Sequence, residues 1–105
     1  NLFDTAPIYG FGMSEKRMGR AFAGRRDEVV LVSKSGVTWD DDQKTFISND
    51  PKITQKMLTQ SLQDLQTDYI DLYMIHWPDA KVDIRESMEV LSAAKEKGQI
   101  RAIGL

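Results

Sequence analysis

The feature that most constrains the fold is a repeated alternation between short apolar runs and segments with helix signals. The runs cover Leu2–Phe3, Val29–Val32, Tyr69–Ile75 and Ile100–Leu105; Val29–Val32 is continuously apolar, and the last two runs contain one charged residue each. Continuous apolar strands that alternate with helices are typical of a parallel sheet with right-handed crossovers. The sequence therefore predicts an α/β fold. A complete (β/α)8 barrel needs about 250 residues, so this chain could hold only part of one, and the pattern alone leaves an open doubly wound sheet as the alternative.

The first predicted helix lies between the first two strands. Ser14 is placed to cap it, and the helix should run to about Ala23 and end at Gly24. Its predicted buried face consists of Met18, Ala21 and Phe22. After the second strand, residues 35–49 are predicted to form a polar loop.

The second and third predicted helices carry clear start signals. Asp50 followed by Pro51 is typical of a helix start, and Asp83 with Glu86 fits a capping box. Gly98 should end the third helix. The predicted inner faces are Ile53, Met57, Ser61, Leu62 and Leu65 in the second helix, and Met88, Leu91 and Ala94 in the third.

Charge and composition exclude several classes of function. The net charge is −2 with scattered Lys and Arg, which argues against a nucleic-acid surface. No apolar stretch approaches a membrane span, and no signal-peptide pattern opens the chain. Without cysteine, and with one histidine, thiolate and histidine-rich metal sites are excluded. The acidic run 40–42 is predicted to be a solvated turn and not a metal cluster. The absence of cysteine fits a reducing compartment, and we expect a cytoplasmic protein.

The two ends of the chain differ from those of a typical domain. It begins on Asn1 rather than Met, and it stops on Leu105 inside an apparent strand. Domains usually begin and end in exposed polar segments. We therefore expect residues 1–105 to be one partial domain, internal to a larger protein.

Polar side chains stand where three predicted strands end. Asp4 ends the first, Lys34 follows the second and His76 follows the third, while Tyr9 comes five residues after Asp4. In parallel α/β folds, the chemistry gathers at the carboxyl ends of the strands. These residues therefore predict one site. Taken singly, each has a more common structural explanation. A lone histidine at a strand end is usually structural, a lysine there is usually solvated, a tyrosine in such a turn is often just packed, and an aspartate often caps the next turn.

The combination suits acid catalysis at a carbonyl. A nearby ammonium favours the phenolate and so makes a tyrosine a better acid. A carboxylate would hold that ammonium in place, and an imidazole could orient a carbonyl oxygen. Such a set can protonate the alkoxide that develops when hydride adds to a carbonyl.

Three motifs then resemble the aldo-keto reductase family, most closely its bacterial stress-type and inositol-cluster branch. They are FDTAPIYGFGMSE at 3–15, LQTDYIDLYMIHWPD at 65–79 and KGQIRAIG at 97–104. The resemblance covers essentially the whole chain. It implies a (β/α)8 TIM barrel, of which this chain holds about strands two to five, and NADP(H)-dependent reduction of aldehydes or ketones.

The resemblance also implies roles for individual residues. The catalytic aspartate falls on Asp4, the general-acid tyrosine on Tyr9, the lysine on Lys34 and the substrate-orienting histidine on His76. Asp4 is also the one cofactor-binding residue expected within the chain. Most of what holds NADP(H) would lie after Leu105. The expected partner is a small carbonyl compound.

Further expectations concern the substrate pocket and the alternatives. Trp39 and Trp77 follow the Lys34 and His76 strands, and we expect one or both to wall an apolar substrate pocket together with His76. The alternatives to a reductase are an NADPH-binding scaffold or sensor and an inactive truncated chain. A partial barrel leaves open strand edges, so this chain is expected to self-associate.

Overall fold

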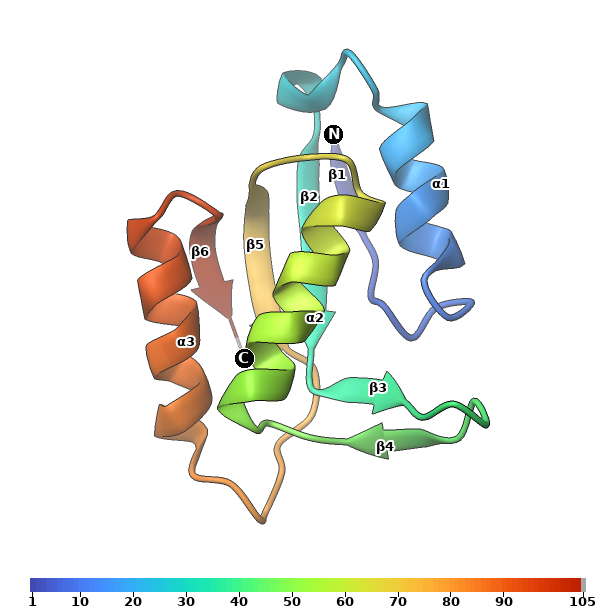
Figure 1. Cartoon of the computed structure of the whole chain (residues 1–105). Coiled ribbons are helices and arrows are strands. Elements are labelled where there is room, and N and C mark those ends of the chain that lie inside the picture. Colours follow the sequence, from blue (N-terminus) through green and yellow to red (C-terminus); the bar gives the residue numbers. More distant parts are fainter. Residues whose placement is uncertain (105) are drawn as a thin grey trace.

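The computed structural model describes residues 1–104 as an alternation of strands and helices (Figure 1). In chain order the elements are β1 (Leu2–Asp4), α1 (Met13–Ala21), the 3-10 turn η1 (Arg26–Glu28), β2 (Val30–Ser35), β3 (Val37–Trp39), β4 (Thr45–Ile47), α2 (Pro51–Asp64), β5 (Ile70–Ile75), α3 (Ile84–Glu96) and β6 (Ile100–Gly104). The four predicted main strands and three predicted helices are confirmed. The expectation that Leu105 extends the last strand lies outside the described residues.

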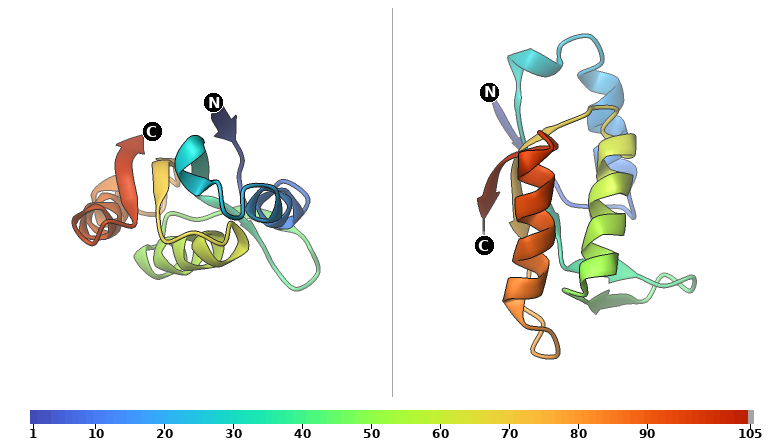
Figure 2. Two further views of the ribbon diagram at one scale, coloured as in Figure 1. Left: turned by 90° about the horizontal axis from the view of Figure 1, so that it is seen from above. Right: turned by 60° about the vertical axis from the view of Figure 1, so that its left-hand side comes forward.

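The main sheet is parallel and open. Its four strands stand in the order β1-β2-β5-β6, and every neighbouring pair is parallel. All three helices cover the same side of this sheet (Figure 2). A doubly wound sheet carries helices on both faces, whereas a barrel carries them only on the outside. The arrangement is therefore an arc of a (β/α)8 barrel, and the doubly wound alternative is excluded.

The core lies between the sheet and the helices. It comprises Leu31, Leu58, Leu65, Ile70, Tyr73, Ile75, Leu91, Ala94 and Ile100. The predicted inner faces of α2 and α3 are largely confirmed, and Met18 and Phe22 of the first helical segment pack against the same core. Ala21, the last residue of the helix, is exposed, contrary to prediction.

The start of α1 differs from the prediction. Gly12, with a φ of 93°, is the N-cap, and no side chain caps the helix. Ser14 lies within the first turn, and its hydroxyl is 2.8 Å from that of Thr5. The helix starts early because a tight left-handed turn at Gly10 and Gly12 leads the chain directly into it.

The predicted polar loop 35–49 is wrong in two respects. β2 continues to Ser35, and an antiparallel hairpin of β3 and β4 follows. Both strands have only three residues, and those of β4 are exposed, so the apolar pattern is too short to reveal the hairpin. The acidic run does form a turn: Asp40 Oδ1 accepts from the amides of Asp42 and Lys44 at 2.9 and 3.0 Å.

The N-caps of α2 and α3 are as predicted, with one difference. Asp50 accepts from the amides of two residues in the first turn of α2, at 2.9 and 3.4 Å. Asp83 accepts from the amide of Arg85 at 3.0 Å. Glu86 is exposed, and the Arg85 guanidinium binds the Asp83 carboxylate in its place. The predicted reciprocal bond from Glu86 is therefore not formed, and the Asp83 carboxylate is held by Arg85 instead.

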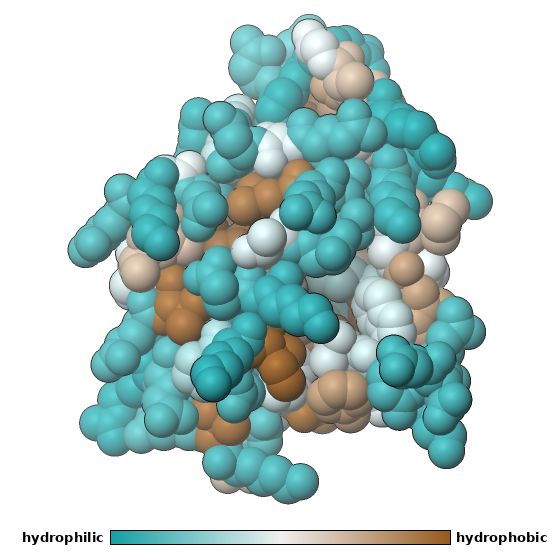
Figure 3. Space-filling model, in the orientation of Figure 1, coloured by the Kyte–Doolittle hydropathy of each residue, from teal (hydrophilic) through white to brown (hydrophobic). Residues whose placement is uncertain are grey.

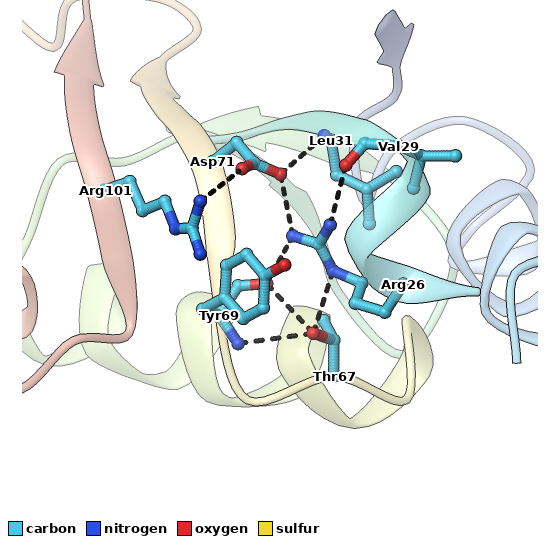
Figure 4. A network of polar contacts seen from close by, with 7 residues as sticks. All are labelled: Arg26, Val29, Leu31, Thr67, Tyr69, Asp71 and Arg101. Carbon is cyan, nitrogen blue, oxygen red and sulfur yellow. Dashed lines mark hydrogen bonds and ion pairs between the residues drawn. The ribbon is translucent and has the colours of Figure 1, made fainter. Parts of the chain in front are cut away.

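A polar network ties together the amino ends of three strands (Figure 4). The Arg26 guanidinium donates to Asp71 and to the carbonyl of Tyr69, both at 2.8 Å, while Asp71 also accepts from the amide of Leu31 at 2.9 Å. Arg26 and Arg101 lie over the Tyr69 ring, 3.9 and 4.3 Å from its centroid. These contacts join β2, β5 and β6 at the end opposite the predicted site.

The surface formed by the helices is mostly hydrophilic, with small separate apolar areas (Figure 3). Within residues 1–104, no helix combines the length and apolar character needed to cross a membrane. The same residues contain no group of three or more His, Asp or Glu placed to hold a metal ion.

Candidate active site

The strand register brings the predicted residues to one end and one face of the sheet. Asp4 pairs with Val32, and Lys34 pairs with Met74 in the next strand. Partners in a parallel sheet share a face, as do residues two apart along one strand. Asp4, Lys34 and His76 therefore lie on the face away from the helices, which is the inner face of the barrel arc.

Lys34 is the fixed centre of the site. Its ammonium pairs with the Asp4 carboxylate and donates to the carbonyl of Thr5 at 2.8 Å. The Lys34 side chain is only 10% exposed, whereas that of Asp4 is 57% exposed. A buried ammonium held by two acceptors keeps its position, so the positive charge is directed at a defined point.

Tyr9 faces that charge. The Lys34 Nζ atom lies 5.5 Å from the centroid of the Tyr9 ring. The ring of His76 stands perpendicular to the Tyr9 ring at a centroid distance of 6.3 Å. Tyr9 is 43% exposed, so its phenol can be reached from the inner face. The structure therefore brings together all four residues of the predicted tetrad.

A hydrogen-bonded turn places Tyr9. Its amide donates to the carbonyl of Ala6 at 3.1 Å, and the amide of Gly12 donates to Pro7 at 2.8 Å. Gly10 and Gly12 take positive φ values, which few other residues adopt without strain. The turn is thus a defined bend between β1 and α1.

His76 is anchored through its backbone. Its amide donates to the carbonyl of Ser35 at 2.7 Å, in continuation of the β2–β5 ladder. Partial burial lowers the pKa of the imidazole, the Lys34 charge lowers it further, and Asp4 opposes the change. The imidazole is therefore neutral at neutral pH and can donate or accept a hydrogen bond.

Asn49 holds the segment after His76, and sequence reasoning did not find it. The side-chain amide of Asn49 donates through Nδ2 to the backbone carbonyl of Trp77 at 3.2 Å. Its Oδ1 accepts from the backbone amide of Asp79 at 2.9 Å. The hydroxyl of Ser87 in α3 donates to the backbone carbonyl of Asn49. Two backbone hydrogen bonds, from Lys81 and Asn49, lower the pKa of Asp79. Asn49 stands in a polar stretch without a motif, so nothing in the sequence marked it.

The two tryptophans occupy different places. Trp77 stacks beside His76, at a centroid distance of 6.2 Å, and is 54% exposed. Trp39 packs edge-to-face on Phe11 at 5.3 Å and lines a cleft between the hairpin and the helices. Of the two, Trp77 is therefore the one placed against the tetrad.

The residues present fit the reacting end of a nicotinamide cofactor and its carbonyl substrate. The half-exposed Asp4 and Tyr9 and the ring of His76 face the same open side of the sheet. Asp4 is the residue expected to border the nicotinamide. In residues 1–104, the side chains gathered here would contact only this end of such a cofactor.

Comparison with known proteins identifies the family of this chain. The sequence profile of the Aldo/keto reductase family matches residues 1–105. The chain belongs to this family. It is 46% identical over 106 residues to "Aldo-keto reductase YhdN" of Bacillus subtilis, covering 99% of this chain and 32% of the relative. It is 38% identical over 117 residues to an Escherichia coli protein named "NADH-specific methylglyoxal reductase", covering 99% and 36%.

Solved structures agree in fold. The glycerol dehydrogenase AKR11B4 of Gluconobacter oxydans has a TM-score of 0.92 and 41% identity, over 99% of this chain and 33% of its own. An aldo-keto reductase of Klebsiella pneumoniae, solved in complex with NADPH, has a TM-score of 0.82 and 33% identity, over 99% and 33%. The chain thus spans about a third of the length of the relatives it matches, as expected for part of a barrel.

Proposed function

We propose that this chain supplies the proton-donating site of an oxidoreductase that reduces aldehydes or ketones to alcohols with NADP(H). The observation that carries the proposal is the geometry around Lys34. Its buried ammonium is paired with Asp4 and lies 5.5 Å from the centroid of the Tyr9 ring. A positive charge fixed beside a reachable phenol is the arrangement that proton donation to a developing alkoxide requires.

Each residue then has a defined task. NADP(H), when bound, would supply a hydride to the carbonyl carbon. Tyr9 donates its phenolic proton to the carbonyl oxygen, and the Lys34 ammonium stabilises the phenolate that remains. Asp4 keeps Lys34 in place through their ion pair. Neutral His76 orients the carbonyl oxygen by a hydrogen bond, and Trp77 borders the substrate on the same side.

The choice of NADP(H) rests on relatives and not on residues of this chain. The Klebsiella pneumoniae neighbour is described in complex with NADPH, whereas the Escherichia coli relative is named as NADH-specific. The tetrad serves either cofactor because it acts on the carbonyl. The preference is therefore open to direct measurement.

The test is the oxidation of NADPH and of NADH by the full-length protein with a simple aldehyde. We expect turnover that depends on the aldehyde and is faster with NADPH. Lys34→Met should reduce kcat by about a hundredfold or more, because the phenolate loses its stabilising charge. Lys95→Met, at an exposed position of α3, is the matched control and should leave kcat unchanged. Absence of aldehyde-dependent turnover with both cofactors would refute the proposal.

A further inference from the structure

A second cleft lies outside the tetrad, between α1, α2 and the β3–β4 hairpin. It has a volume of about 460 Å³, which is in the range that binds small molecules. No tetrad residue lines it. Its wall contains three aromatic side chains, and its floor is formed where α1 approaches α2. The residues used below are Phe11, Glu15, Trp39, Phe46 and Asp64.

Glu15 is a buried carboxyl group whose hydrogen-bonding capacity is only half used. The side chain is fully buried and lines the cleft. Its Oε1 accepts from the hydroxyl of Ser61 at 3.0 Å, while its Oε2 has no hydrogen-bond partner among the described residues. A buried carboxyl oxygen without a partner is costly, so it marks a place where a donor is missing.

Asp64 adds a second acidic group to the same floor. Its Oδ1 accepts from the side chain of Gln60 at 3.0 Å. Its Oδ2 faces Gly12, where a Cβ would come within 3.4 Å of it. Lys16 and Lys56 also line the cleft, yet neither forms an ion pair with these two acids within residues 1–104. Among the described residues, neither acid therefore has an ion-pair partner.

Glu15 and Asp64 line the same cleft, and the charge of Asp64 acts on Glu15. Burial is the main reason that the pKa of Glu15 rises to about 7, and the negative charge of Asp64 raises it further. Of the charged groups on the neighbouring elements, Asp64 of α2 raises the pKa of Glu15 and Lys34 of β2 lowers it, while Glu15 itself raises the pKa of Tyr73 of β5. A cation bound between the acids would favour the charged form of Glu15.

The aromatic wall suits the body of an organic cation. Phe11 and Trp39 pack edge-to-face at 5.3 Å, and Phe46 of the hairpin is 43% exposed. Aromatic faces attract organic ammonium groups and cover apolar carbon. A bare metal ion fits less well, because residues 1–104 offer no group of three ligating side chains.

We propose that this cleft binds a small primary amine in its ammonium form. The ammonium group lies at the floor against Asp64 and Glu15, and the apolar part of the amine packs on Phe11, Trp39 and Phe46. Binding expels the Glu15 proton, so affinity increases as the pH rises through about 7. The proposal is independent of carbonyl reduction, since the cleft shares no residue with the tetrad.

The test is calorimetric titration of the full-length protein with benzylamine and with benzyl alcohol, its uncharged counterpart, at pH 8. We expect benzylamine to bind at least about tenfold more tightly than the alcohol. Asp64→Asn and Glu15→Gln should each weaken benzylamine binding about tenfold. Glu89→Gln removes an exposed charge on α3 and is the matched control.

Tryptophan fluorescence tests whether benzylamine binds in this cleft. In a Trp77→Phe background, benzylamine should change the emission of Trp39, and in a Trp39→Phe background that change should be absent. Thermal melting identifies any variant that fails to fold. If Glu15→Gln does not fold, the test rests on Asp64→Asn, because Asp64 is only half-buried. Equal affinity for amine and alcohol, binding unaffected by both acidic substitutions, or no saturable binding would overturn the proposal.

Discussion

At the scale of single residues, the site depends on the positions of the Lys34 ammonium and the Asp4 carboxylate. Lys34 is buried and paired with Asp4, and its ammonium lies 5.5 Å from the centroid of the Tyr9 ring. The four tetrad residues could be predicted from the sequence because each stands at a strand end, or in the turn that follows one. Asn49 and the Glu15–Asp64 pair could not, because their environment comes from packing between distant segments.

The first prediction concerns His76. Its imidazole should titrate below 6.5 in nuclear magnetic resonance spectra, because burial and Lys34 both disfavour the charged ring. Lys34→Met should raise the midpoint, since the Asp4 charge then acts without the opposing ammonium. Lys95→Met should leave it unchanged. An unaltered midpoint in Lys34→Met would show that the two side chains do not interact.

The second prediction concerns Glu15 in the absence of any amine. Its pKa is about 7 in the folded chain and 4.5 ordinarily, a difference that corresponds to about 3 kcal/mol. Because the folded-state pKa is the higher one, this stability is fully present below about 4.5 and is lost as the pH rises through about 7. Glu15→Gln should therefore flatten the decline in unfolding free energy between pH 5 and pH 8, measured with urea. A decline as steep as that of the original chain would contradict this.

At the scale of elements, the strands and the long helices could be predicted because periodicity and caps mark them. The hairpin could not, since its strands are three residues each and largely exposed. The start of α1 was misplaced because the glycine turn, and not a capping side chain, sets it. The sequence therefore predicts the elements that bury a regular row of apolar side chains. It does not predict those whose position is set by a backbone turn.

The third prediction concerns the contact between α1 and α2. A Cβ at Gly19 would lie 2.5 Å from the carbonyl oxygen of Asp64, which is backbone and cannot turn away. In an ordinary helix, alanine is about 1 kcal/mol more favourable than glycine. Here the clash should win, and Gly19→Ala should lower the unfolding free energy by about 2 kcal/mol. Thermal or urea unfolding measures this, and a stabilised Gly19→Ala variant would show that the helices are not in close contact.

At the scale of the whole molecule, the arc has an uncovered inner face. Leu2 is 65% exposed and Val30 is 42% exposed on that face, and β1 and β6 are both edge strands. The open fold was predicted from the length of the chain and from the family resemblance.

The fourth prediction is therefore that the isolated 105-residue chain self-associates through these surfaces. Analytical ultracentrifugation should show oligomers that grow with concentration. Leu2→Lys should reduce association by placing a charge on the apolar face, whereas Glu89→Lys on the covering helix should not. A monodisperse monomer at high concentration would contradict the prediction.

The central claim is that Tyr9 is the proton donor in carbonyl reduction. The most direct measurement is the single-turnover rate of aldehyde reduction by the full-length protein with NADPH bound, for the original chain and for Tyr9→Phe. We expect a loss of about a hundredfold to ten-thousandfold with NADPH binding nearly unchanged, because only the proton is removed. Tyr69→Phe, which keeps its ring in the polar network, should react at the original rate. Undiminished turnover by Tyr9→Phe would show that Tyr9 is not the proton donor.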